Sequence, residues 1–243
     1  MKGHVIVGGF TTVGAAAVRE LLASGREVVV IAENAKEEEA ARGAVRPERT
    51  PVVRGDLTSP ETLERAEVGK AASLILCHSE DTVNLIAALF TRNVHPTVRV
   101  VVSLHRPELR KTLKAAGVTF IVSTKDMGGR MCASAAFRPE VVQTLEDLTT
   151  AAYGADVQEY RVLEGAPIAG LPLLEAERRV RQASDCLVLG IVRGPGPAGK
   201  EEYRTVINPP SSTRFDVGTA VLVIGSLANL KRFAQWYGLP QGR

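Results

Sequence analysis

The sequence predicts an α/β protein: a doubly wound parallel sheet followed by a second, smaller α+β lobe. In the first half, strand-like apolar runs alternate with helical patterns, the order typical of parallel βαβ units. In the second half, short apolar runs alternate with turns rich in Pro and Gly. We expect a first lobe at residues 1–125, a helical crossover and hinge at 126–150, and a C-terminal lobe at 151–243.

The elements of the first lobe follow from these patterns. Six strands are expected at Val5–Gly8, Val28–Ala32, Pro51–Arg54, Ser73–Leu76, Val98–Ser103 and Thr119–Val122. Five helices are expected at Thr12–Ser24, Ala35–Gly43, Pro60–Ala66, Asp81–Arg92 and Pro107–Ala116. Ser59 before Pro60 is a favourable helix start, because serine caps and proline fits the first helical position.

The second half has a different pattern of apolar and turn residues. Pro139 should break the helical segment between Lys125 and Thr150, because proline inside a helix removes a hydrogen bond. Strands are expected at Val157–Leu163, Cys186–Val192, Tyr203–Ile207 and Ala220–Ile224, with a turn at Gly194–Gly199 and a last helix at Leu227–Tyr237.

The first sixty residues run strand, tight turn, helix, strand, acid, which is the order of a Rossmann-like dinucleotide-binding unit. Gly9 and Gly14 are the first and third glycines of the G-x-G-x-x-G turn, and Thr11 replaces the second. That second glycine normally lets the backbone approach a pyrophosphate. The fold indication is therefore strong and the ligand motif is damaged, which favours sensing or scaffolding over hydride transfer.

Composition excludes several classes of function. The net charge of +3 over 243 residues, with acids among the bases, gives no basic face for nucleic acid. No apolar stretch approaches the roughly 18 residues needed to span a membrane, so we expect no direct membrane insertion. The three cysteines, Cys77, Cys132 and Cys186, form no CxxC pair, and we expect buried, reduced thiols in a cytoplasmic protein.

Several short segments in a fixed order identify a family. They are His4–Phe10, Glu33, Val53–Asp56 with Leu63–Ala66, Ser79–Ala88, Ala116–Val118 with Ile121–Ser123, Gly129–Met131, Glu164–Gly165 with Ile168–Gly170, and Ile207–Pro210 with Phe215, Gly218 and Val221–Gly225. In this order the sequence resembles the RCK family, the regulator-of-potassium-conductance domains and the related cytoplasmic subunits of bacterial potassium transporters.

The resemblance implies a ligand-sensing gating-ring module and not an enzyme. Such modules pair through the helix after the sixth strand and through the C-terminal lobe, and the homodimers form an octameric ring. The ring lies in the cytoplasm, peripheral to the inner membrane, and regulates a potassium channel pore or the membrane subunit of a transporter. Candidate faces between neighbours in the ring are the apolar helices Thr82–Phe90 and Pro107–Ala116.

The resemblance also implies where an adenine nucleotide, NAD, ADP or ATP, would bind. Glu33, with Asn34 beside it, stands where the family holds the ribose hydroxyls, although Glu33 could instead only cap the following helix. A carboxylate there disfavours a 2′-phosphate, and thus NADP. The backbone at Gly9 and Phe10 would face phosphates at a helix N-terminus, where free N–H groups favour anions.

Other residues of the expected pocket are less favourable to a ligand. Thr11 adds a Cβ atom where the family has none, and Thr12 stands where some members carry an arginine. Gly55 and Asp56 would line the adenine side, or form only a strand-end turn.

The fourth strand ends in Cys77, His78 and Ser79, and the fifth in Ser103 and His105. The carboxyl ends of parallel strands border the ligand crevice. Calcium-gated relatives carry carboxylates at positions matching Cys77, Ser103 and His105. Calcium requires hard oxygen ligands, so we expect no calcium at that site.

Three alternatives stay open at this point. Cys77, His78 and His105 could bind zinc, although a fourth ligand is missing and Cys77 is typical of a buried strand. The same three residues are the only candidates for acid–base or nucleophilic work in an NAD-dependent oxidoreductase. Lastly, the chain could form a structural ring whose pocket is vestigial, as Thr11 and Thr12 suggest.

Overall fold

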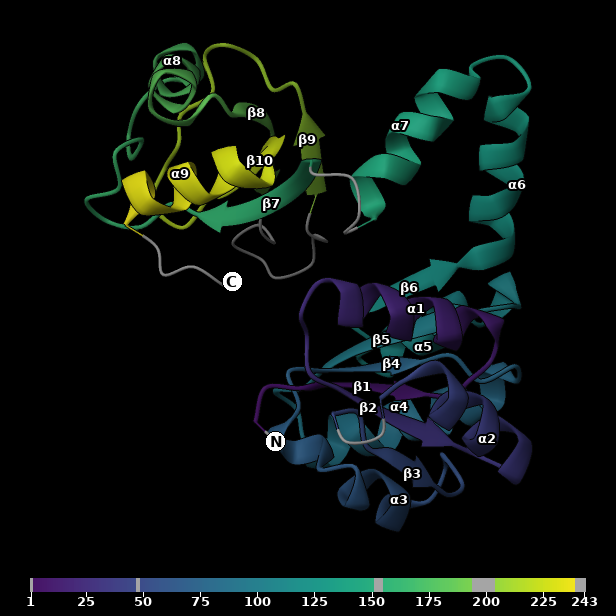
Figure 1. The fold of residues 1–243 in the computed structure, drawn as a ribbon. Helices are drawn as coiled ribbons and strands as arrows, with labels where there is room; N and C mark the ends of the chain where they lie inside the picture. The colour runs from purple at the N-terminus through teal and green to yellow at the C-terminus, as the bar shows by residue number, and fades with distance from the viewer. Residues whose placement is uncertain (1, 47–48, 151–154, 194–203, 239–243) are drawn as a thin grey trace. The chain divides into compact units, whose positions relative to one another are not determined.

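The computed structural model describes residues 2–46, 49–150, 155–193 and 204–238 (Figure 1). The chain separates into two compact units, Met1–Val142 and Gln143–Arg243. The division into 1–125, 126–150 and 151–243 stays a prediction. The expected turn at Gly194–Gly199 lies outside the described residues.

The first unit is built on a six-stranded parallel sheet with the strand order β3-β2-β1-β4-β5-β6. Its strands are β1 (Val5–Gly8), β2 (Val28–Ala32), β3 (Val52–Arg54), β4 (Ser73–Leu76), β5 (Arg99–Leu104) and β6 (Phe120–Ser123). The strand order reverses between β1 and β4, which pair from Val5↔Ser73 to Gly8↔Leu76. This arrangement confirms the doubly wound, Rossmann-like fold predicted from the sequence.

Helices connect these strands. They are α1 (Thr12–Ala23), α2 (Ala35–Ala44), α3 (Pro60–Arg65), the short 3₁₀ helix η1 (Val68–Lys70), α4 (Asp81–Val94), η2 (Pro107–Leu109) and α5 (Arg110–Ala115). The helix predicted at Pro107–Ala116 is therefore two pieces, a 3₁₀ turn that begins at proline and a short α-helix. The strand predicted at Val98–Ser103 is one residue later.

Alternate side chains of the sheet enter two separate cores. Val7, Val28 and Val30 pack with α1 and α2 residues such as Val18 and Ala41. On the other face, Ile6, Val29 and Ile31 join a larger core formed with α3, α4 and α5, in which Leu63, Ala87, Ala88 and Leu113 are buried. Burial on both faces explains why the central strands are continuously apolar rather than alternating. Because both faces of the sheet are covered by helices, only the ends of the strands, where polar residues follow, can form a site.

Two helices follow β6, and Pro139 separates them as predicted: α6 (Thr124–Ala135) and α7 (Pro139–Thr149). Helix α6 has no buried residue, and the ring of Phe137 just after it is 88% exposed. Cys132 on α6 is also exposed, so the expectation that all three thiols are buried is wrong for this one. The reason is that α6 buries none of its side chains fully among the residues that the structure describes.

The second unit is a four-stranded antiparallel sheet with two helices. Its elements are β7 (Ala155–Arg161), α8 (Leu173–Ser184), β8 (Leu187–Arg193), β9 (Arg204–Ile207), β10 (Ala220–Ser226) and α9 (Leu227–Tyr237). The strand order is β7-β10-β8-β9. Tyr160, Phe233 and Tyr237 form a ring cluster in its core, with centroids 4.6 Å apart for Tyr160 and Phe233. This is the smaller α+β lobe that the sequence predicts.

Candidate functional site

The turn between β1 and α1 is held tightly against the end of β4. Gly9 has φ +89°, and a Cβ atom there would lie 2.8 Å from the backbone nitrogen of His78. A Cβ atom at Gly14 would lie 2.1 Å from the carbonyl oxygen of Gly9. Gly9 is therefore required by its backbone conformation and by packing, and Gly14 by packing alone, whatever the turn binds.

Thr11 replaces the middle glycine without strain. Its backbone is extended, with φ −74° and ψ 178°, and the residue is the N-cap of α1. The hydroxyl accepts a hydrogen bond from Gly14 N at 3.3 Å and donates one to the carbonyl oxygen of Cys77 at 2.8 Å. The side chain thus caps the helix and ties the turn to β4.

The N-terminus of α1 presents open donors beside this cap. Thr11 satisfies the N–H of Gly14, whereas the N–H groups of Thr12 and Val13 in the same first turn lack an intrahelical acceptor. The side chain of Thr12 is exposed. Such donors, together with the positive end of the helix dipole, favour an anion.

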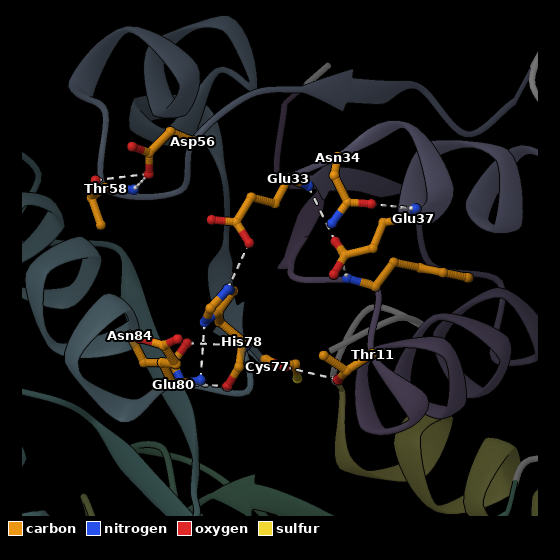
Figure 2. A network of polar contacts seen from close by, with 11 residues as sticks. Thr11, Glu33, Asn34, Glu37, Asp56, Thr58, Cys77, His78, Glu80 and Asn84 are labelled. Atoms are coloured by element: carbon orange, nitrogen blue, oxygen red, sulfur yellow. Dashed lines mark hydrogen bonds and ion pairs between the residues drawn. The ribbon is translucent and has the colours of Figure 1, made fainter.

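Two residues predicted for the site meet across the sheet. Glu33 follows β2, His78 follows β4, and Glu33 Oε2 lies 2.7 Å from His78 Nε2 (Figure 2). The imidazole is 8% exposed and the Glu33 side chain 37% exposed. Because His78 Nδ1 accepts a hydrogen bond from Glu80 N at 3.0 Å, the neutral ring carries its proton on Nε2, which donates to Glu33.

Glu37 is a site residue that the sequence reasoning missed. Its Oε2 accepts hydrogen bonds from Phe10 N at 3.3 Å and from Glu33 N at 3.1 Å, which places a carboxylate between the glycine turn and the end of β2 (Figure 2). Asn34 caps α2 by accepting from Glu37 N at 3.0 Å. The spacing Asn34-x-x-Glu37 is a capping-box pattern, and it was the available signal that Glu37 turns back toward the turn.

Gly55 and Asp56 have local partners. A Cβ atom at Gly55 would lie 2.4 Å from Thr62 Oγ1 of α3. Asp56 Oδ1 accepts from both the hydroxyl and the backbone nitrogen of Thr58, each at 2.7 Å, which lowers the pKa of Asp56. The geometry is that of the strand-end turn considered from the sequence.

At the end of β4, a buried amide fixes the main chain. Asn84 of α4 accepts from His78 N at 3.1 Å and donates to the His78 carbonyl oxygen at 2.9 Å. Burial raises the pKa of the neighbouring Cys77 thiol to about 11. This thiol therefore stays protonated at neutral pH and is a poor nucleophile.

His105 belongs to a second group beyond β5. The buried carboxylate of Asp81 accepts from His105 N at 3.0 Å and from Arg106 N at 2.7 Å, and it lies 3.1 Å from His105 Nδ1. A cavity of about 400 Å³ is lined here by Ser79, Glu80, Asp81, Thr82, His105 and Arg106. Ser103 is buried, and its hydroxyl has no partner among the described residues. The structure brings His78 to Glu33 and His105 to Asp81, and not to each other.

Comparison with known protein families assigns both units. The TrkA-N domain model matches residues 5–124, and the TrkA-C domain model matches residues 157–238. The chain belongs to the family of proteins that combine a TrkA-N domain with a TrkA-C domain. The resemblance to RCK proteins is thereby confirmed.

Relatives of this chain are named for potassium transport. It is 23% identical over 241 residues to potassium channel protein 1 of Methanocaldococcus jannaschii, covering 97% of this chain and 68% of that protein. It is also 23% identical over 177 residues to a Trk system potassium uptake protein TrkA homolog of Pyrococcus abyssi, covering 71% and 75%.

The human SLO3 gating ring has the same fold, with a TM-score of 0.66 at 17% identity, covering 98% of this chain. The present chain spans 46% of the length of that gating-ring chain.

The described part of the chain holds no cluster of three or more His, Cys, Asp or Glu residues arranged for a metal. In the same part, no helix has both the length and the apolar character needed to cross a membrane. At the carboxyl edge of the first sheet, carboxylates that already accept hydrogen bonds lie next to N–H groups at the start of α1 that have no intrahelical acceptor. Carboxylates accept hydrogen bonds from a diol, and amides donate to a phosphate.

Proposed function

We propose that this chain is the regulatory module of a potassium channel or transporter and that it senses an adenine nucleotide. The observation that carries the proposal is the arrangement at the carboxyl ends of β1 and β2. The open N–H groups of Thr12 and Val13 lie at the start of α1, and the carboxylates of Glu33 and Glu37 lie around the same turn. One nucleotide would use both features through its phosphate and its ribose.

The two carboxylates restrict the class of nucleotide. Glu33 and Glu37 each keep a second oxygen that can accept a ribose hydroxyl. A 2′-phosphate beside two negative charges would be repelled, so NAD, ADP and ATP fit and NADP does not. The names of the channel and uptake-system relatives support a role in potassium transport.

Thermal unfolding of the full chain against NAD, NADH, AMP, ADP, ATP and NADP tests the proposal. A ligand that binds only the folded state at a hundredfold excess over its Kd stabilises by about 2.7 kcal/mol. We expect a shift with at least one adenine nucleotide, a loss of that shift in Glu33→Ala, and none with NADP. Glu61→Ala, at an exposed position of α3, is the matched control and should keep the shift.

A structural ring with a vestigial pocket is the second candidate, and a specific observation favours it. Glu33 is paired with His78, and the N–H of Phe10 already has Glu37 as its acceptor. These groups therefore need no ligand to be satisfied. The absence of any nucleotide shift, together with an intact oligomer, would establish this role in place of sensing.

For assembly we propose homodimers that join into an octameric ring in the cytoplasm, beside the pore at the inner membrane. Helix α4 carries Ile86, Leu89 and Val94, each about half exposed, which suits a contact between neighbours. Phe90 instead packs against the core of its own unit. Leu89→Glu should therefore reduce the octamer to folded dimers in light scattering. An octamer that survives this change would contradict the assignment of α4.

A further inference from the structure

Two contacts connect the turn after β1 to the end of β4 at the carboxyl edge, and a third joins the ends of β2 and β4. Thr11 Oγ1 donates to the carbonyl oxygen of Cys77 at 2.8 Å, directly between β1 and β4. Gly9 packs so closely on His78 that a Cβ atom would lie 2.8 Å from its nitrogen. The Glu33–His78 bridge joins the ends of β2 and β4 at 2.7 Å. All three lie where the strand order reverses.

The Glu33–His78 bridge passes over β1, since β1 lies between β2 and β4 in the sheet. Neighbouring strands are about 4.8 Å apart, so the bridge spans roughly 10 Å of the carboxyl edge. In Figure 2 the two side chains point toward one another across this interval. A ligand that extends from Glu33 to the β4–β5 side must cross the line between them.

The imidazole is held in the bridging position independently of Glu33. Glu80 N donates to Nδ1 at 3.0 Å, and Asn84 holds both the N–H and the carbonyl of the His78 main chain. The imidazole is only 8% exposed, so the bridge is a fixed, largely buried interaction and not a solvent-exposed ion pair.

Dinucleotides bind across the crevice at such a switch point, with one nucleotide on each side. A mononucleotide needs only the side formed by β1, β2 and β3. Resting on the proposed function, we propose that Thr11 and His78 close the β4 side of the crevice and select an adenine mononucleotide over a dinucleotide. The ribose would be accepted by the free oxygens of Glu33 and Glu37 without opening the bridge.

His78→Asn tests the bridge with little disturbance. Asparagine can still accept the Glu80 N–H two residues on, and it is too short to reach Glu33. Thr11→Gly removes the hydroxyl contact to Cys77, and glycine at an N-cap costs little stability. The matched control is His95→Asn, which removes the His95–Glu64 pair at 2.8 Å in the same unit.

Isothermal titration of the four full-length proteins with ADP and NAD measures the selection. We expect the wild type to bind ADP at least about tenfold more tightly than NAD, the effect of one charge-assisted hydrogen bond that must break. His78→Asn and Thr11→Gly should each reduce this ratio about tenfold by strengthening NAD binding, and His95→Asn should leave it unchanged.

Two results overturn the inference, and they are distinguishable. Nucleotide binding with an equal or NAD-favouring ratio in the wild type, or a ratio unmoved by both crevice variants, overturns the selection and leaves the proposed function intact. Failure of all four proteins to bind either nucleotide overturns the proposed function, and the selection with it. Circular dichroism of each variant confirms that the fold is retained.

Discussion

The two units bury different kinds of side chain. In the first, His78, Asp81, Asn84 and Ser103 are buried at the carboxyl ends of β4 and β5. In the second, Ser184 is the only polar residue buried within the described part, and the interior is apolar with a ring cluster. Burying polar groups costs free energy unless they are hydrogen-bonded. In the first unit, hydrogen bonds made by His78, Asp81 and Asn84 offset that cost at the strand ends, and the second unit is built for packing.

In the first unit, the buried polar side chains hold loops in place. Asn84 fixes the main chain of His78, and Asp81 fixes that of His105 and Arg106. Each anchor lies at the start of α4 and reaches a strand end. The contrast between the units therefore predicts that core changes in the second unit affect global stability, and anchor changes in the first unit affect local order.

The largest effect is expected from Phe233→Ala, which removes the central ring of the second unit. Emptying a fully buried phenylalanine site costs about 3–5 kcal/mol. Trp236 is the only tryptophan of the chain, and its ring lies 5.8 Å from that of Phe233. Urea unfolding followed by tryptophan fluorescence therefore reports this unit. Leu174→Ala, at a 70% exposed position, is the control, and equal losses in both variants would refute the packing role.

An intermediate effect is expected from Asp81→Ala in the first unit. The change leaves the N–H groups of His105 and Arg106 without their acceptor, at a cost of about 1–3 kcal/mol. Hydrogen exchange should accelerate at these two amides, while the tryptophan-monitored transition stays where it was. Exchange that is unchanged at both amides would show that Asp81 is not an anchor. Glu39→Ala, at an exposed position of α2, serves for comparison.

The smallest effect concerns alkaline pH. Burial raises the pKa of Tyr160 and of Tyr237 to about 12, above the usual value of about 10. A raised pKa means that the folded state holds the proton more tightly. The resulting stability is complete below about pH 10 and is lost as the pH rises toward 12.

Tyr160→Phe removes one of these two groups, so the tryptophan-monitored stability should fall less steeply with pH above about 10. Measuring urea midpoints at neutral and alkaline pH separates this slope from the loss of the Tyr160 hydrogen bond to Gln158. A slope equal to that of the wild type would mean that Tyr160 titrates normally in the folded protein.

Much of the fold could be predicted because the hydrophobic periodicity and the positions of helix-breaking residues indicate the same element boundaries. The continuous apolar runs at β1 and β2 mark buried parallel strands, and Pro139 divides α6 from α7. The candidate site was only partly predictable. Glu33 and His78 were each chosen for their place at a strand end, but their contact spans 45 residues and depends on the strand order.

Other features could not follow from a linear pattern. In the sequence, Thr11 is a departure from the glycine motif. Its roles as a helix cap and as a link to Cys77 depend on side-chain geometry. Glu37 bonds the backbone of the turn, whereas Glu33 bonds His78, and this difference depends on side-chain conformations. The exposure of Cys132 depends on whether α6 packs against its own chain, which local composition does not reveal.

Helix α6 has a further consequence. It is 12 residues long and buries no side chain, and isolated helices of this length are marginal in water. If copies of the chain pair along it, the helix and the dimer form in a single linked equilibrium. Helicity in this segment then obeys mass action: it rises with protein concentration and falls on dilution. A gating ring built in this way would transmit force through a connector that becomes stiff only once the ring has assembled.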